Sequence, residues 1–216
     1  MLDKINPGLR PISSPEENSV VTSPADCHYR AQYPIDANSN IEEITIKKTH
    51  KFASILDLLD GSPYADRFAN GTFVHYFLGP YSYHRFHTPV AGLLKECRAH
   101  VGKVYLNVEL QNGQFNAPDN STDGYEFSQS RGIVIIDTAN SPEGDIGLVG
   151  VVPVGMCQVS SVQMTGQPGN YFQKGDEFGY FLFGGSDIIL LFQEGVNPQI
   201  STGSTYRLYG TQVARV

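Results

Sequence analysis

The sequence has few cysteines, little charge and no long hydrophobic run. Its 216 residues include three cysteines, Cys27, Cys97 and Cys157, which are widely separated and form no C-x-x-C motif. This number and spacing argue against a disulfide framework or a zinc ribbon and indicate free thiols. The longest uninterrupted apolar stretch is residues 188–192 (IILLF). A membrane-spanning helix needs roughly 18 such residues, so the sequence predicts none.

Positive charge is also scarce. The chain has 15 Lys and Arg residues against 22 Asp and Glu residues, and its formal net charge is −7. Binding to nucleic acid or to an anionic membrane needs a positive surface, so we expect no nucleic-acid partner. The first residues are polar and interrupted by prolines, which is not typical of a signal peptide. We therefore expect the protein to be cytoplasmic or peripheral to a membrane.

The residues present predict a β-rich fold. Hydrophobic residues make up 40% of the chain, enough for a core. Residues 1–40 are rich in Pro, Ser, Asn and Asp and predict an extended, irregular segment. Residues 52–59 place apolar side chains at helical spacing, and Gly61 and Pro63 end that helix. Alternating or buried apolar patterns predict strands at 73–78, 103–109, 132–137, 146–154, 157–163, 178–183, 187–193 and 205–209. We predict a single α+β domain over residues 1–216, predominantly antiparallel β, with a sandwich or barrel core and one or two short helices.

Two short segments carry side chains that suit acid–base chemistry. Residues 23–27 (SPADC) contain Asp26, which is either a turn former or a functional carboxylate. Residues 83–89 (YHRFHTP) contain His84 and His87. These histidines suit acid–base work, metal ligation or ordinary hydrogen bonding. A zinc site needs a third protein ligand, and none is suitably spaced, so we predict no metal.

A third segment contains a serine after two glycines. Residues 174–187 (KGDEFGYFLFGGSD) place Gly184, Gly185 and Ser186 between two apolar strands. One interpretation is a hairpin whose glycines supply positive φ. The other is a strained backbone that exposes the Gly185 carbonyl to the Ser186 hydroxyl, which then needs a base and a group that orients the base.

Taken together and in this order, the segments resemble the phosphatidylserine decarboxylase family. The resemblance extends from residues 6–11 (NPGLRP) to about Gln193. It depends on residues 23–26, on residues 83–92 (YHRFHTPVAG), on Val154 and Gly155, and on residues 174–186 (KGDEFGYFLFGGS).

The resemblance implies a proenzyme that cuts itself between Gly185 and Ser186. Ser186 would attack the Gly185 carbonyl, with His87 as base oriented by Asp26, and elimination would leave a pyruvoyl group at residue 186. That ketone would form a Schiff base with a substrate amine and accept the electrons released as CO₂ leaves, without pyridoxal phosphate. His84 is the candidate for proton handling during decarboxylation.

The sequence departs from the family pattern at three places. Asp187 follows the serine where Thr or Ser is usual, and its carboxylate could repel a substrate carboxylate or bind a substrate ammonium group. Ala91-Gly92 and Asp26-Cys27 each stand where Asp-Gly is usual. None of these changes removes a predicted catalytic residue.

The substrate and some alternatives stay open at this point. Phosphatidylserine fits the family, and a free aromatic amino acid fits a soluble branch of it. The chain starts at the Pro-Gly-x-Arg-Pro stretch, so a missing N-terminal region would have to supply membrane contact. A homodimer, a catalytically silent binding homologue and a lipoyl-type carrier remain alternatives. The carrier follows from residues 149–192, which resemble the barrel-sandwich hybrid, with Lys174 near a turn.

Overall fold

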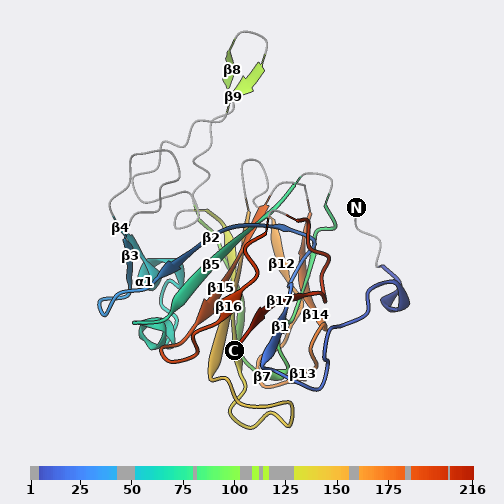
Figure 1. Cartoon of the computed structure of the whole chain (residues 1–216). Helices are drawn as coiled ribbons and strands as arrows, with labels where there is room; N and C mark the ends of the chain where they lie inside the picture. The colour runs from blue at the N-terminus through green and yellow to red at the C-terminus, as the bar shows by residue number, and fades with distance from the viewer. Residues whose placement is uncertain are drawn as a thin grey trace.

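The computed structural model describes residues 5–42, 52–79, 82–102, 109–111, 114–116, 129–155, 161–182, 186–203 and 205–216. A seven-stranded antiparallel sheet forms its centre, in the order β13-β7-β10-β11-β15-β5-β2. In Figure 1, β2, β5 and β15 run side by side across this sheet. The strands are β2 (His28–Pro34), β5 (Thr72–Leu78), β7 (Gly92–His100), β10 (Arg131–Asp137), β11 (Leu148–Gly155), β13 (Tyr171–Phe172) and β15 (Ser186–Phe192).

Smaller sheets and short helices complete the described part of the chain. One sheet has the order β12-β14-β6 and another the order β1-β17-β16, and two hairpins pair β3 with β4 and β8 with β9. The strands are β1 (Val20–Thr22), β3 (Asn40–Glu42), β4 (Phe52–Ser54), β6 (Arg85–His87), β8 (Glu109–Gln111), β9 (Gln114–Asn116), β12 (Val162–Met164), β14 (Glu177–Phe181), β16 (Gln199–Ile200) and β17 (Gln212–Arg215). The helical segments are η1 (Pro7–Leu9), α1 (Ile55–Leu58) and η2 (Ala65–Phe68).

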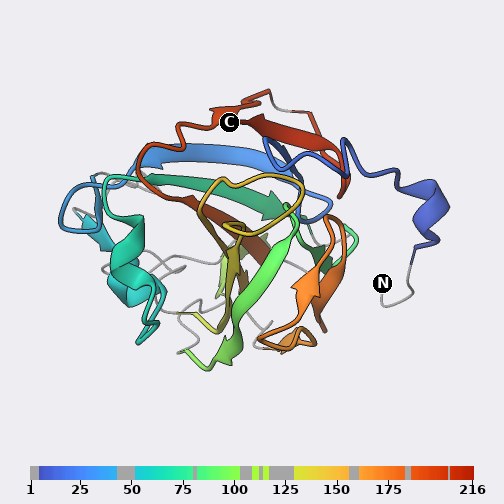
Figure 2. The same cartoon turned by 90° about the horizontal axis from the view of Figure 1, so that it is seen from below.

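The central sheet buries a hydrophobic cluster on each face. Because side chains alternate along a strand, Ile188 and Leu190 of β15 join one cluster and Ile189 and Leu191 join the other. The first cluster, the sandwich core, lies between the central sheet and the sheets that contain β1, β6 and β14. The second, the helix-side core, is covered by α1 and η2. Figure 2 shows β12 and β14 in orange on one side of the sheet and the helical segments α1 and η2 in teal on the other.

The predicted fold class is confirmed: the structure is mainly antiparallel β with short helices, and its central sheet is open. The predicted strands at 73–78, 132–137, 146–154, 178–183 and 187–193 correspond to β5, β10, β11, β14 and β15. The described part of 157–163 belongs to β12. Most of 103–109 and residues 157–160 lie outside the described residues.

Three local predictions were wrong. The helix over 52–59 begins only at Ile55, because Phe52–Ser54 pairs as β4 and the Ser54 side chain caps the helix by accepting from Asp57 N–H. Residues 205–209 form an isolated bridge at Arg207 followed by a turn, and Gly210, at φ +83°, separates this turn from β17. The described residues 5–40 are not irregular throughout, because they contain β1 and β2.

The strands on either side of the two glycines do not pair with each other. β14 pairs with β12 and β6, whereas β15 pairs with β11 and β5. The chain therefore leaves the small sheet after Phe181 of β14 and enters the centre of the large sheet at Ser186, the first residue of β15.

Candidate active site

The four predicted catalytic side chains come from three separate segments of the chain, and all are buried. Asp26 lies in the connection between β1 and β2, His84 directly precedes β6, His87 ends β6, and Ser186 begins β15. Their exposed fractions are 3%, 2%, 5% and 0%. Gly185, the other residue of the predicted cleavage site, lies outside the described residues.

His87 is held by hydrogen bonds at both ring nitrogens. Its Nδ1 lies 2.8 Å from the Gly175 carbonyl oxygen, so the neutral ring carries its proton on Nδ1 and donates it there. The Tyr83 hydroxyl lies 3.2 Å from Nε2 and is then the donor to that nitrogen. Burial lowers the pKa of His87, so the ring is neutral at pH 7 and Nε2 carries a lone pair.

Asp26 lies in the same cluster but contacts His87 through a third residue. Its Oδ1 accepts from the Tyr209 backbone N–H at 2.8 Å, and its Oδ2 accepts from Arg10 at 3.1 Å. The Tyr209 ring stacks on the His87 ring with 3.8 Å between centroids and 4° between planes. Among the described residues, Asp26 therefore positions the stacking partner of His87. Burial remains the main influence and lowers the pKa of His87, and the negative charge of Asp26 offsets only part of this lowering.

The hydrogen-bond acceptor that orients the His87 ring is the Gly175 carbonyl, which the sequence reasoning missed. Gly175 has φ +90°, and a Cβ there would lie 2.5 Å from Ile12 Cδ1, so the position requires glycine. Thr88 fixes this turn, because its hydroxyl donates to the Gln173 carbonyl and its carbonyl accepts from Gly175 N–H. The K-G-D-E motif and its unexplained glycine were the available sequence signal.

Lys174 fastens the same turn to the N-terminal segment. Its Nζ donates to the carbonyls of Ser14, Glu17 and Val20 at 2.5–2.8 Å, and burial lowers its pKa to about 8. The side chain is 4% exposed. A lipoyl-type carrier needs an exposed lysine, so the structure contradicts the carrier interpretation.

His84 occupies an apolar position beside the sandwich core. Its Nδ1 lies 2.5 Å from the Ser82 carbonyl, and its ring meets the edge of Phe181 at 6.2 Å between centroids. Burial lowers the pKa of His84 as well, so it is neutral at pH 7.

Ser186 has an unusual side-chain environment. Its Oγ is buried, and it makes no hydrogen bond within the part of the chain that the structure describes. Its neighbours in register are Leu78 of β5 and Gly155 of β11. Strand alternation places Ser186 on the same face as Ile188, toward the sandwich core. A buried hydroxyl without a partner costs free energy, which is typical of a functional group rather than a packing residue.

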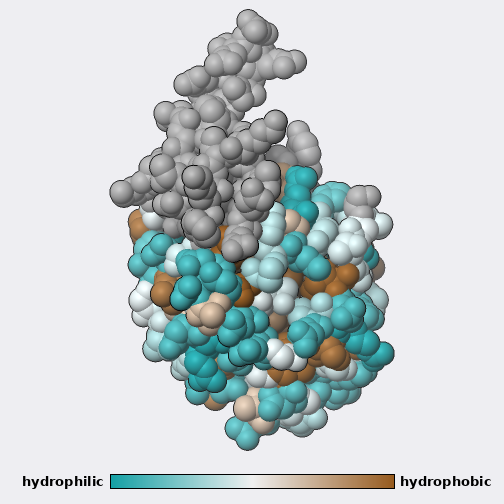
Figure 3. Space-filling view, turned by 60° about the vertical axis from the view of Figure 1, so that its left-hand side comes forward, coloured by the Kyte–Doolittle hydropathy of each residue, from teal (hydrophilic) through white to brown (hydrophobic). Residues whose placement is uncertain are grey.

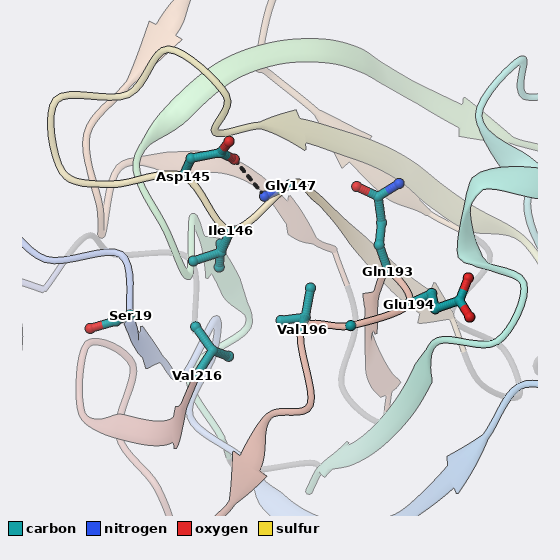
Figure 4. A pocket seen from close by; sticks show the side chains of 9 residues that line it. Ser19, Asp145, Ile146, Gly147, Gln193, Glu194, Val196 and Val216 are labelled. Atoms are coloured by element: carbon teal, nitrogen blue, oxygen red, sulfur yellow. Dashed lines mark hydrogen bonds between the residues drawn. The ribbon is translucent and has the colours of Figure 1, made fainter.

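A cavity of about 580 Å³ lies elsewhere, at the far end of β15. Figure 4 shows Ile146, Val196 and Val216 around this space, with the Asp145 carboxylate turned to the Gly147 N–H. It adjoins Gln193, which follows the last residue of β15, whereas Ser186 is the first. At about 3.3 Å per residue the two ends are about 20 Å apart, so this cavity does not belong to the candidate site.

Other surface and ligand features are few in the described ranges. They contain no group of three or more His, Cys, Asp or Glu side chains arranged to hold a metal ion. None of the described helices has the length and hydrophobicity to cross a membrane. On the face in Figure 3, hydrophobic residues occur in small groups separated by hydrophilic ones.

Comparison with known proteins gives the same family as the motifs. The family model for phosphatidylserine decarboxylase matches residues 1–215. The chain is 31% identical to phosphatidylserine decarboxylase proenzyme 2 of Oryza sativa subsp. japonica over 88% of this chain and 28% of that protein. It is 32% identical to a proenzyme of Chlamydia trachomatis over 88% of this chain and 57% of the relative. It is 32% identical to the phosphatidylserine decarboxylase proenzyme of Alcanivorax borkumensis over 93% of this chain and 70% of that protein.

The chain thus spans 28% and 57% of the first two relatives and 70% of the third. The family match nevertheless runs over nearly the whole chain and includes every segment that carries Asp26, His84, His87 and Ser186. This chain belongs to the phosphatidylserine decarboxylase family.

Proposed function

We propose that the protein is a self-processing decarboxylase that acts on phosphatidylserine through a pyruvoyl group made from Ser186. The observation that carries this proposal is the buried Ser186 Oγ without a hydrogen-bond partner in the described residues. It stands at the start of β15, in the large sheet, whereas the preceding strand β14 belongs to a different sheet. Family membership supplies the class of reaction.

In the self-cleavage step, Ser186 Oγ attacks the Gly185 carbonyl carbon. The bond between that carbon and the Ser186 nitrogen breaks, and an ester to Oγ forms. Elimination then releases the new carboxylate of Gly185, and hydrolysis releases ammonia and leaves the pyruvoyl group on residue 186. His87 suits the base role, because its Nε2 carries a lone pair at neutral pH. Tyr83 donates to this nitrogen in the uncleaved chain and must turn aside before Nε2 accepts the serine proton.

The residues around Ser186 fit a small uncharged ketone. Leu78, Gly155 and Ile188 surround its position in the sheet, and Asp187 lies on the opposite face. A pyruvoyl group there would condense with the substrate amine and accept the electrons released as CO₂ leaves. We assign the handling of the proton that replaces CO₂ to His84, a neutral histidine beside the sandwich core.

Replacing His84 separates decarboxylation from cleavage. We expect His84→Ala to give the same two pieces as the wild type while lowering kcat about 100-fold, because general acid–base catalysis contributes about that factor. The measurement is CO₂ release from phosphatidylserine, with the pieces quantified on the same sample. A variant that cleaves and turns over normally contradicts the assignment.

The function itself is tested on the purified wild-type chain. A denaturing gel and an intact mass should show pieces of residues 1–185 and 186–216, with a carbonyl on the smaller piece that reacts with a hydrazide. Phosphatidylserine in mixed micelles should release CO₂, and a free aromatic amino acid should not. A full-length mass only, with no CO₂ released, contradicts the proposal.

The finer partner predictions are tested on the same protein. Sedimentation with phosphatidylserine vesicles measures membrane association, and light scattering distinguishes a monomer from the homodimer that the resemblance leaves open.

A further inference from the structure

A buried contact between a histidine and an aspartate joins the second residue of β15 to the neighbouring strand. His75 Nε2 of β5 lies 3.0 Å from Asp187 Oδ1, and the side chains are 6% and 0% exposed. Asp187 is opposite Phe77 in register, and His75 is opposite Ile189, so the two side chains form a diagonal cross-strand pair.

The pair lies on the opposite face of the sheet from Ser186. Ile188 and Leu190 follow Ser186 into the sandwich core, whereas Ile189 and Leu191 follow Asp187 into the helix-side core. The Asp187 carboxylate therefore does not face a group bound at the Ser186 side chain. Direct repulsion of a substrate carboxylate, or binding of its ammonium group, does not fit this geometry.

Three neighbours of the pair on this face are apolar, and the buried Arg131 of β10 lies one strand further on, opposite Val154. Val154, the register partner of Asp187 on β11, belongs to the helix-side core, as do Phe73 and Ile189. Transferring a carboxylate and its imidazole partner into such a core costs desolvation free energy, and well-packed apolar side chains often give equal or greater stability. Net stability therefore does not account for the pair, and its position in the sheet is the better explanation.

The position matters because of the proposed cleavage, on which this step rests. After cleavage His75 belongs to the piece of residues 1–185 and Asp187 to the piece of residues 186–216. Residue 186 then becomes a chain end, and chain ends lose order unless they are tied down. We infer that the His75–Asp187 pair is a tie between the two pieces that positions residue 186 in register with Leu78 and Gly155. Asp187 follows the reacting residue on β15 and His75 lies on the neighbouring strand opposite Ile189, so both are positioning residues.

The test removes the charge and keeps the shape. We expect Asp187→Asn to lower kcat about tenfold and to leave KM within about twofold, because a misplacement of about 1 Å at the reacting group is costly and the carboxylate does not touch substrate. His75→Gln keeps an N–H donor for Asp187 and should retain most of kcat. His75→Leu removes this donor and should lower kcat as much as Asp187→Asn does. Ile189→Val, on the same face of β15, is the control for lost packing and should keep kcat.

A second readout does not depend on activity. Hydrogen exchange of the first amides of β15 should be faster in Asp187→Asn than in the wild type or Ile189→Val, in the uncleaved chain as well as in the cleaved one. If the first amides of β15 exchange at the wild-type rate in Asp187→Asn, the inference is wrong, whether or not the wild type cleaves. If Asp187→Asn has a raised KM and a normal kcat, the inference is also wrong, and Asp187 contacts substrate instead. A wild-type chain that stays at full length overturns the proposed function alone, and the exchange result still decides the tie.

Discussion

Ser186→Ala is expected to leave the chain at full length and without decarboxylase activity. The substitution removes the oxygen that attacks Gly185 and the side chain from which the pyruvoyl group is made, so both steps stop together. Intact mass measures cleavage, and CO₂ release from phosphatidylserine measures activity.

Unfolding does not account for this loss, and the stability of the variant tests that point. Ser186 Oγ is buried and makes no hydrogen bond among the described residues, so its removal leaves none of their polar groups without a hydrogen-bond partner. We expect Ser186→Ala to be as stable as the wild type or more stable by about 1 kcal/mol, measured by urea unfolding of uncleaved chains. Ser62→Ala, which removes a hydroxyl that donates to Glu96, is the control and should still cleave. Cleavage of the Ser186→Ala chain at the same bond would falsify the nucleophile assignment.

His87→Ala is expected to slow self-cleavage at least about 100-fold, because the variant has no base at this position. The ring lies against Tyr209, with the Tyr83 ring stacked on both at 5.8 and 5.5 Å, so its removal leaves a flat space between aromatic side chains. Added imidazole fits that space chemically and should restore part of the cleavage rate. The measurement is a time course of the full-length band, starting from chain refolded in vitro. His100→Ala, a histidine paired with Asp60, is the control.

The pH profile of cleavage gives a further check on His87. Burial lowers its pKa in the folded chain, so the ring stays neutral to a pH below its usual value near 6.5. The cleavage rate should therefore stay constant on acidification through pH 6.5 and fall only below it. The same shift makes the unfolded chain bind more protons in that window, so stability falls as the pH drops below 6.5. If acidification lowers the cleavage rate to half its maximum at a pH above 7, the base is not a buried neutral histidine.

Much of the central sheet was predictable because its strands carry their own signal. β5, β10, β11 and β15 are rich in β-branched and aromatic residues, which prefer a pleated, buried surface. Local patterns failed where a neighbour decided the outcome. The apolar residues of 52–59 have helical spacing, but pairing with β3 holds Phe52–Ser54 as a strand. The two glycines before Ser186 resemble a hairpin turn, but β14 and β15 each find better partners in different sheets.

The candidate site divides in a similar way. The residue types of the motifs identified Asp26, His84, His87 and Ser186, and the structure buries all four. The acceptor on His87 Nδ1 was not predictable, because a backbone carbonyl has no side-chain signature and Gly175 lies 88 positions from His87. The stacking of Tyr209 was equally hidden, since it depends on Asp26 holding the Tyr209 backbone across 183 positions.

The sequence by itself determined the β-rich class, the motifs and the resemblance to one family, because strand preference and reactive residue types are local properties of the chain. Only the tertiary structure decided which groups touch: Gly175 and Tyr83 on His87, Tyr209 between Asp26 and His87, and His75 on Asp187. It also decided that Ser186 and Asp187 face opposite cores. Strand alternation requires opposite faces of neighbouring residues, but the sheet partners determine which core each face meets.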